Sequence, residues 1–211
     1  DNLGIKEAVE MIKSCGEEVP SWITEMIESG AKSFYVFEDG KKKFYDINSK
    51  KYINVPSSEN HYILDAFREN KQILKNPECT VHDIGDGVMC IEFQTKGNSI
   101  GEGIARGINE AIDIAERDGW NGIVIGNNDK QFSVGANLMN MGMMAMQKNF
   151  DEIEKFLVGF QQILMRMRTC NVPVVSATHG FVMGGGLEVS IHCDAGIHAS
   201  ESYIGLVEAG V

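Results

Sequence analysis

Three consecutive glycines, Gly184 to Gly186, stand between an apolar β-branched run, 172–175, and a segment typical of the start of a helix, 187–193. Glycine has no Cβ, so a ligand can approach its main chain closely. The first amides of a helix have no partner within the helix and favour negative charge. The pattern therefore predicts an anion or oxyanion site, with Glu188 nearby on the first helical turn. The alternative is a tight turn that needs glycine for packing alone.

A second segment joins a predicted strand to a polar loop that contains glycine. The strand 122–125 leads into the loop 127–137, which ends in Gly135, Ala136 and Asn137. The following run, 138–147, holds five methionines. Methionine is unbranched and adaptable, so this run predicts either a pocket for a variable apolar ligand or a methionine-rich helix in the core.

Composition and charge argue against several classes of function. The 211 residues carry a net charge of −11 without a basic stripe, so no nucleic-acid partner is expected. No apolar run approaches the ~20 residues that span a bilayer, and no residue spacing is typical of a metal site. The cysteines are odd in number and form no CxxC pair, which favours reduced thiols and a cytoplasmic protein. They are Cys15, Cys79, Cys90, Cys170 and Cys193.

The first 55 residues differ from the rest in the pattern of their apolar residues. They predict helices over 3–13 and 22–28, the second capped by Ser21, and a hairpin over 34–45. This segment is too small to fold well by itself. The residues that follow Asp1 do not have the pattern of a signal peptide, so we expect none here, and we expect the chain to be a piece of a longer protein.

Residues 56–78 are polar and predict a partly helical linker. The helical pattern rests on a few apolar side chains, namely Ile63, Ala66, Phe67, Ile73 and Leu74. Alternation begins at Cys79 and predicts a hairpin around the turn 85–87, because an Asp-Gly pair between extended segments favours that turn. Two helices are then expected, one over 102–117 and one, capped by Asp151, over 151–168. The inward residues predicted for the first are Ile104, Ile108, Ala111, Ile112 and Ala115. Those predicted on one face of the second are Ile153, Phe156, Leu157, Phe160, Leu164 and Met167.

Glycines 101, 103 and 107 nearly match a dinucleotide-binding fingerprint. The third glycine comes one residue late, and the next strand ends in Gly126-Asn127 without an acidic residue for a ribose. We therefore do not expect a nucleotide site there.

Two motifs, KQFSVGANL (130–138) and HGFVMGGGLEVSIHCD (179–194), together resemble the enoyl-CoA hydratase/isomerase, or crotonase, superfamily. The resemblance covers roughly residues 80–211. It implies an α/β fold, the repeated β-β-α spiral of that superfamily, over 79–211, incomplete at its C-terminus and preceded by the small helical and hairpin segment. It also implies a coenzyme A thioester as the substrate.

The resemblance assigns roles to individual residues. In the superfamily two backbone N–H groups hold the thioester oxygen, and by position these belong to Ala136 and Gly185. The substrate-binding positions that it implies are Gly135, Asn137, Leu138, Gly184 and Gly186. The superfamily usually has Asp where this chain has Asn137, which could alter a supporting hydrogen bond but not a main-chain donor.

Hydratases of this superfamily also use two glutamates, matched here by Glu188 and Glu208. The resemblance implies that Glu188 activates water and that Glu208 passes a proton to C2 of the substrate. Two carboxyl groups can divide the base and acid roles when their surroundings separate their pKa values. The general alternatives are a first-turn helix charge for Glu188 and an ordinary surface residue for Glu208.

Residues 1–55 resemble, more weakly, the end of a 3-hydroxyacyl-CoA dehydrogenase. The order of the two parts implies a bifunctional enzyme of fatty-acid β-oxidation, oligomeric at full length. NAD is expected only in the upstream part, and the hydratase part is expected to need no cofactor.

Three competing functions remain open. An enoyl-CoA isomerase or a non-catalytic acyl-CoA-binding subunit would share the same fold. A hydrolytic triad of Ser176, His179 and Asp194 is disfavoured because no nucleophile elbow surrounds the serine. His192, four residues after Glu188, could face the site, but a lone helical histidine is more often structural.

Overall fold

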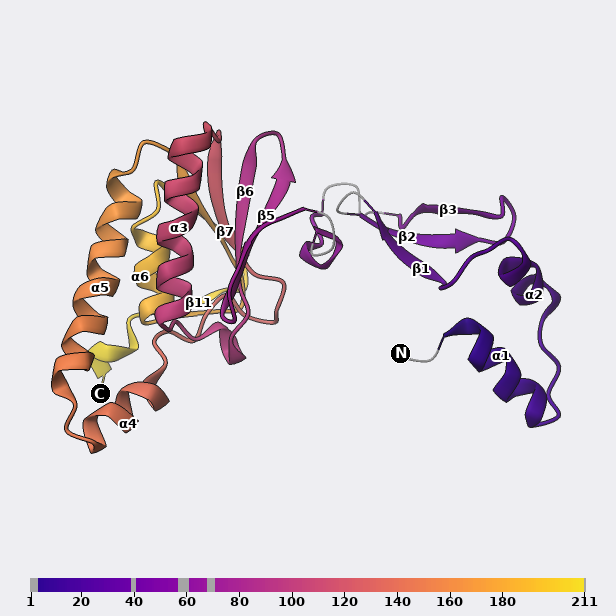
Figure 1. The fold of residues 1–211 in the computed structure, drawn as a ribbon, viewed down its shortest axis with the longest axis horizontal. Helices are drawn as coiled ribbons and strands as arrows, with labels where there is room; N and C mark the ends of the chain where they lie inside the picture. Colours follow the sequence, from indigo (N-terminus) through magenta and orange to yellow (C-terminus); the bar gives the residue numbers. More distant parts are fainter. Residues whose placement is uncertain (1–3, 39–40, 57–60, 68–70, 211) are drawn as a thin grey trace. The chain divides into compact units, whose positions relative to one another are not determined.

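The computed structural model describes residues 4–38, 41–56, 61–67 and 71–210. It divides into two compact units, Asp1–Ala66 and Phe67–Val211, shown in Figure 1. The division falls within the segment 56–78 that the sequence assigns to a linker. Each unit has its own hydrophobic core.

The first unit combines two helices with a three-stranded antiparallel sheet. The helices are α1 (Ile5–Ser14) and α2 (Ser21–Glu28), and the strands, in sheet order, are β1 (Tyr35–Glu38), β2 (Lys41–Asp46) and β3 (Lys51–Asn54). Its core is small, and its buried apolar side chains are Ile5, Val9, Met26 and Tyr45. The hairpin prediction is confirmed, although its turn at 39–40 lies outside the described residues and β3 was not predicted. Ser21 is the first helical residue and makes no capping bond.

The second unit is built on a six-stranded sheet with the order β10-β8-β7-β6-β5-β4. The strands are β4 (Gln72–Lys75), β5 (Cys79–Gly85), β6 (Val88–Phe93), β7 (Gly122–Gly126), β8 (Val174–Thr178) and β10 (Ala195–His198). Strands β6, β7, β8 and β10 are parallel to one another, whereas β4, β5 and β6 pair antiparallel. Residues 73 and 74, which the sequence placed in a helical pattern, therefore lie in an edge strand.

The turn between β5 and β6 has the predicted form. Asp86 and Gly87 form a two-residue loop between the paired residues Gly85 and Val88. Both loop residues have positive φ, 54° and 72°. This conformation matches the twist of the two strands, and Asp-Gly adopts it readily.

A second, smaller layer of parallel pairing accompanies the sheet. Strand β9 (Phe181–Met183) pairs with β11 (Tyr203–Gly205), and isolated bridges join Ser133 to Val182 and Ile100 to Ala136. The chain thus repeats one path: a strand of the large sheet, a short extended segment of the small layer, and then a helix. Segments that are tens of residues apart in sequence come to lie side by side in the small layer.

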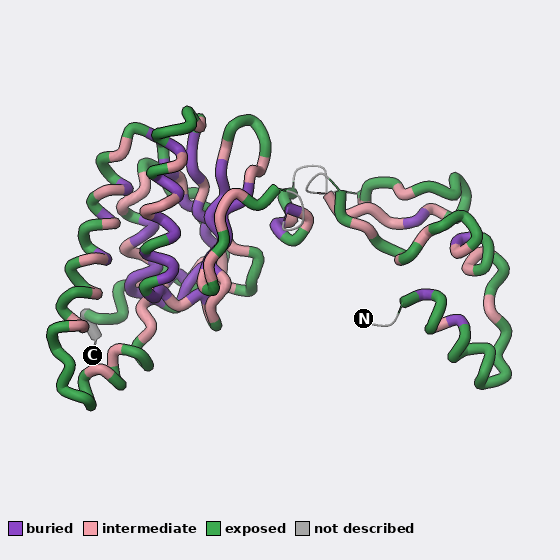
Figure 2. Tube along the Cα trace, viewed as in Figure 1, coloured by how far each residue is buried: buried purple, intermediate pink, exposed green. Residues whose placement is uncertain are grey.

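Helices follow each pass through the small layer. They are α3 (Glu102–Asp118), α4 (Leu138–Met146), α5 (Phe150–Thr169), α6 (Gly185–Ile191) and the short 3₁₀ helix η3 (Val207–Gly210). The predicted inward face of α3 is confirmed, since Ile104, Ile108 and Ile112 are all buried in the core. Figure 2 shows the burial of each described residue along the trace.

Helix α5 differs from its prediction in two details. It begins at Phe150 after Asn149, so Asp151 lies in the first turn and is not the cap. Leu157, expected on the inward face, is 43% exposed. Phe160, Leu164 and Met167 are buried as predicted.

Candidate active site

The main-chain amides of Ala136 and Gly185 lie close together although 49 residues separate them in sequence. The nitrogen of Ala136 is 3.5 Å from the point that a Cβ on Gly185 would occupy. A Cβ sits roughly 2.5 Å from its own nitrogen, so the two nitrogens are at most about 6 Å apart. Two donors at this separation can both reach one oxygen.

Neither amide is used elsewhere in the described part of the chain. The bonds around Ala136 are made by its neighbours, because Ile100 donates to the carbonyl of Gly135 and accepts from the amide of Asn137. Gly185 is the first residue of α6, where an amide has no partner within the helix. Among the residues that the structure describes, no acceptor is found for either N–H group.

The three consecutive glycines have different surroundings. Gly184 has a φ of +48°, which favours glycine. A Cβ on Gly186 would lie 2.6 Å from the Cβ of Ser133, too close for any side chain. A Cβ on Gly185 would meet only ordinary contacts, the nearest at 3.5 Å. Packing and backbone conformation therefore explain the first and third glycines but not the middle one.

Both predicted glutamates lie beside this turn. The amide of Glu188 donates to the carbonyl of Gly184 over 3.0 Å, within the first turn of α6. The carboxylate of Glu208, in η3, lies against Gly184, with its Cδ 3.1 Å from the point that a Cβ there would occupy. Glu188 is half-buried and Glu208 is exposed. The fold thus brings two carboxylate residues to the glycine turn from separate segments.

Asn137 and the methionine-rich helix border a small cavity. Asn137 precedes α4, and its side-chain oxygen accepts from the amide of Asn140 over 3.3 Å. A cavity of about 220 Å³ is lined in part by Asn137, Met141 and Met144. No residue of α4 is buried, so the alternative of a core helix is wrong. Leu138 is 74% exposed, and its amide donates to the carbonyl of Ala136.

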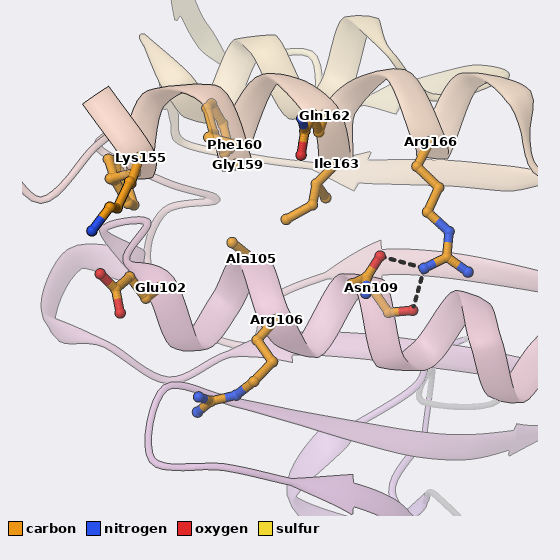
Figure 3. A pocket seen from close by; sticks show the side chains of 11 residues that line it. Glu102, Ala105, Arg106, Asn109, Lys155, Gly159, Phe160, Gln162, Ile163 and Arg166 are labelled. Atoms are coloured by element: carbon orange, nitrogen blue, oxygen red, sulfur yellow. Dashed lines mark hydrogen bonds between the residues drawn. The ribbon is translucent and has the colours of Figure 1, made fainter. Parts of the chain in front are cut away.

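A larger cavity of about 530 Å³ lies between α3 and α5 (Figure 3). Phe160 borders this cavity, and its ring also lies 3.6 Å from the Cβ position of Gly185. At the far end, Arg166 donates to the side chain and the carbonyl of Asn109, as the dashed lines in Figure 3 show. Polar side chains line both ends of the cavity, Glu102 and Lys155 at one end and Asn109 and Arg166 at the other, and apolar side chains such as Phe160 and Ile163 lie between them.

Comparison with known proteins agrees with this geometry. The sequence matches the family model for enoyl-CoA hydratase/isomerase over residues 83–211, which is more than half of the chain. The chain belongs to the enoyl-CoA hydratase/isomerase family.

Two relatives place this family member in context. A Bacillus subtilis protein, named as a probable 3-hydroxyacyl-CoA dehydrogenase, is 36% identical over 212 residues, covering 100% of this chain and 26% of its own length. The short-chain-enoyl-CoA hydratase of Clostridium acetobutylicum is 33% identical over 89 residues, covering 42% of this chain and 33% of that protein. The chain therefore spans about a third or less of these relatives.

A solved structure of the family confirms the predicted fold class. The enoyl-CoA hydratase from Thermoplasma volcanium superposes with a TM-score of 0.56 at 24% identity. The match covers 64% of this chain and 53% of that structure. The repeated strand, extended segment and helix described above are thus an instance of the crotonase fold.

The departure from the family pattern at residue 137 has a local explanation. The side chain caps α4 through an oxygen, and asparagine and aspartate both serve as N-caps. Replacing the usual aspartate by Asn137 therefore preserves this bond and leaves the main-chain donor of Ala136 in place.

The hydrolytic triad does not assemble in this family member. The hydroxyl of Ser176 bonds that of Ser190, His179 bonds the carbonyl of Asp129, and Asp194 accepts from the amide of Val174. Within the described residues no hydrogen bond joins two of the three triad candidates. The ring of His192 bonds the carbonyl of Glu188, a contact within its own helix.

The near-fingerprint of glycines serves packing. Glu78 accepts from the amides of Gly103 and Ile104, so its carboxylate occupies the N-terminus of α3 where a phosphate would bind. A Cβ on Gly107 would collide with the thiol of Cys79. In the described part of the chain, no helix is long and apolar enough to cross a membrane, and no cluster of His, Cys, Asp or Glu suits a metal ion.

Sequence reasoning did not identify Ser133 or Glu78. Ser133 lies within the first motif and is fully buried, yet its hydroxyl bonds two main-chain groups. A serine flanked by apolar residues in an otherwise polar loop was the available signal.

Proposed function

We propose that this chain adds water across the C2–C3 double bond of a 2-enoyl-CoA, forming a 3-hydroxyacyl-CoA. The observation that carries the proposal is the pair of amides of Ala136 and Gly185, which have no acceptor among the described residues, lie within reach of one oxygen and adjoin two glutamates. Addition of water places negative charge on the thioester oxygen, and preorganised amides stabilise that charge.

Glu188 and Glu208 supply the proton transfers in this proposal. Glu188 takes a proton from water as its oxygen bonds to C3, and the electron pair of the double bond moves to form the enolate. The enolate then collapses, and C2 takes a proton from Glu208. Atoms and charge balance without any oxidant, so hydration itself needs no cofactor and no metal.

The surroundings of the donors support substrate contacts for the other predicted residues. Gly135, Gly184 and Gly186 shape the two donor turns, and Asn137 opens onto the methionine-lined cavity. We assign Leu138 to the rim of the substrate site, because its side chain is exposed and its amide bonds the carbonyl of Ala136.

The proposal also includes a longer polypeptide of which this chain is one part. The Bacillus relative matches this chain over its full length and is named as a dehydrogenase. We therefore assign residues 1–55 to the end of a 3-hydroxyacyl-CoA dehydrogenase part, 56–78 to a linker and 79–211 to the hydratase part. Such a protein would use NAD in its dehydrogenase part and oxidise the product of hydration, as in fatty-acid β-oxidation.

We infer a reducing, cytoplasmic location for this enzyme from its cysteines, which are odd in number and form no CxxC pair. All five cysteines are free. Burial raises the pKa of the Cys79 thiol to about 11 and that of Cys90 to about 12. Thiols with such pKa values are almost fully protonated near neutral pH and react slowly. Oligomerisation of the intact protein belongs to the same proposal.

A hydration assay tests the proposal. The native protein should convert crotonyl-CoA to 3-hydroxybutyryl-CoA. The reaction is monitored by the loss of the ultraviolet absorbance of the conjugated thioester. Conversion of a 3-enoyl-CoA to the 2-enoyl isomer without hydration would make the protein an isomerase. Binding of acyl-CoA without either reaction would make it a non-catalytic subunit.

A further inference from the structure

Ser133 joins its own loop to two other segments, to β9 through its main chain and to Asn98 through its hydroxyl. Its amide donates to the carbonyl of Phe181, and its carbonyl accepts from the amide of Met183, each over 3.0 Å. Its hydroxyl donates to the carbonyl of Asn98 over 2.7 Å and accepts from the amide of Gly135 over 3.1 Å. The residue is fully buried.

The main-chain bonds of Ser133 fix the position of the amide donor of Gly185. They hold the strand β9, whose last residue, Met183, is two positions before Gly185. Gly186 packs directly on Ser133, because a Cβ at Gly186 would be 2.6 Å from the Cβ of Ser133. The first turn of α6 is therefore seated on this serine.

The hydroxyl of Ser133 fixes the position of the amide donor of Ala136. It holds the amide of Gly135, the residue directly before Ala136. It also joins this segment to Asn98, a buried residue whose own side-chain amide donates to the carbonyl of Gln131 over 2.9 Å. The loop that carries Ala136 is thereby tied at both ends.

We propose that Ser133 is a positioning residue that sets the separation and direction of the two amide donors, an inference that rests on the proposed hydratase function. The hydroxyl does not touch the substrate. It holds the Ala136 loop against the same segment on which the Gly185 turn is seated. Removing it leaves the carbonyl of Asn98 and the amide of Gly135 buried without a partner, and the loop relaxes to satisfy them.

The test compares Ser133→Ala with Ser176→Ala in the intact native protein. Ser176 is a matched control, because it is also fully buried and its hydroxyl also bonds another group, that of Ser190. Both variants lose one buried hydroxyl and should lose similar thermal stability. Ser133→Cys keeps a weak donor and acceptor and is measured beside Ser133→Ala. Its kcat should lie below that of the wild type and, where the alanine variant folds, above that of the alanine variant.

We expect Ser133→Ala to lower kcat for crotonyl-CoA hydration by about ten- to a hundredfold with KM changed less than about threefold, because oxyanion donors act mainly in the transition state. Hydrogen exchange, measured by mass spectrometry on the free protein, should become faster in peptides covering 133–137. Ser176→Ala should change neither quantity.

An unchanged kcat or unchanged exchange in an active Ser133→Ala protein would overturn the role of Ser133 alone. An equal loss of kcat in Ser176→Ala would overturn it too, since the effect would then be general loosening. A wild-type protein without hydratase activity would instead overturn the proposed function, and with it the catalytic meaning of this contact.

Discussion

Gly135 directly precedes one amide donor, Ala136, and Gly185 is itself the other donor. The two positions are glycine for different reasons. Gly135 has a φ of +96°, and a Cβ there would lie 2.9 Å from the carbonyl oxygen of Met183. Gly185 has no such backbone conformation, and the nearest atom to its Cβ position is the Ala136 nitrogen at 3.5 Å. The fold requires a glycine at the first position. At the second the fold tolerates a methyl group, but that methyl would lie 3.5 Å from the Ala136 nitrogen and border the space between the two amides.

This difference separates the requirements of folding from those of catalysis within one small region. A glycine that the backbone requires should affect stability when replaced. A glycine that only the ligand requires should affect turnover alone. The two positions can therefore be tested against each other.

The largest effect is expected for Gly185→Ala. The added methyl fits the free protein, yet it crowds the space between the two amides, so both donors approach the thioester oxygen less well. We expect kcat to fall by about 10⁴-fold or more, because each of the two donors contributes about 10²–10³-fold, with little change in melting temperature. Steady-state kinetics and calorimetry on the same preparation measure both. A fully active Gly185→Ala enzyme would contradict the assignment of this turn.

Glu188→Gln is expected to have the next largest effect. The amide cannot accept a proton from water, and general acid–base groups contribute about 10²–10⁴-fold. Affinity for a saturated acyl-CoA, measured by calorimetric titration, should change little. Glu208→Gln is the matched comparison, and an unaltered kcat in either variant removes that carboxylate from the mechanism.

Gly135→Ala should differ from Gly185→Ala in lowering the folding stability. A non-glycine residue at positive φ and a contact closer than 3 Å together cost roughly 1–3 kcal/mol of folding stability. Denaturant unfolding should reveal this loss. If Gly135→Ala were as stable as the wild type, the contrast between the two glycines would fail.

The smallest effect is expected for Gly142→Ala, which marks the baseline of the comparison. Gly142 lies inside α4, and no atom is within 4 Å of its Cβ position. Alanine favours a helix interior by roughly 0.5–1 kcal/mol over glycine. Stability should rise by up to that amount, with unchanged kcat. A loss of stability would show that the open space around this position is filled in the intact protein.

The sequence predicted the local elements of the site better than their arrangement. The Asp-Gly turn, the inward face of α3 and the glycine turn before α6 follow from local rules of conformation and periodicity. Strand β4 was missed because Ile73 and Leu74 continue a helical spacing from Ala66 and Phe67, whereas pairing with β5 decides their conformation.

The meeting of the two amide donors could not be derived from residue pattern. It depends on the small layer of parallel pairing, where Ser133 bridges Val182 and Ile100 bridges Ala136. The two donor segments share the short pattern Phe-x-x-Gly-x-x-Leu, at 132–138 and 181–187, with Ala136 and Gly185 at the same position in each. The pattern by itself does not say that the two segments pair. The resemblance to the family supplied the pairing in advance, and the structure supplies its physical basis.

The central claim, that the amides of Ala136 and Gly185 act on one oxygen, is tested most directly by a crystal structure of the native protein with a saturated acyl-CoA. Such a ligand has no double bond to hydrate and should remain bound. The account predicts its thioester oxygen at about 2.7–3.1 Å from both nitrogens, with Glu188 and Glu208 on either side of the C2–C3 bond. A thioester oxygen bound away from either amide, with the ligand otherwise well ordered, would contradict it.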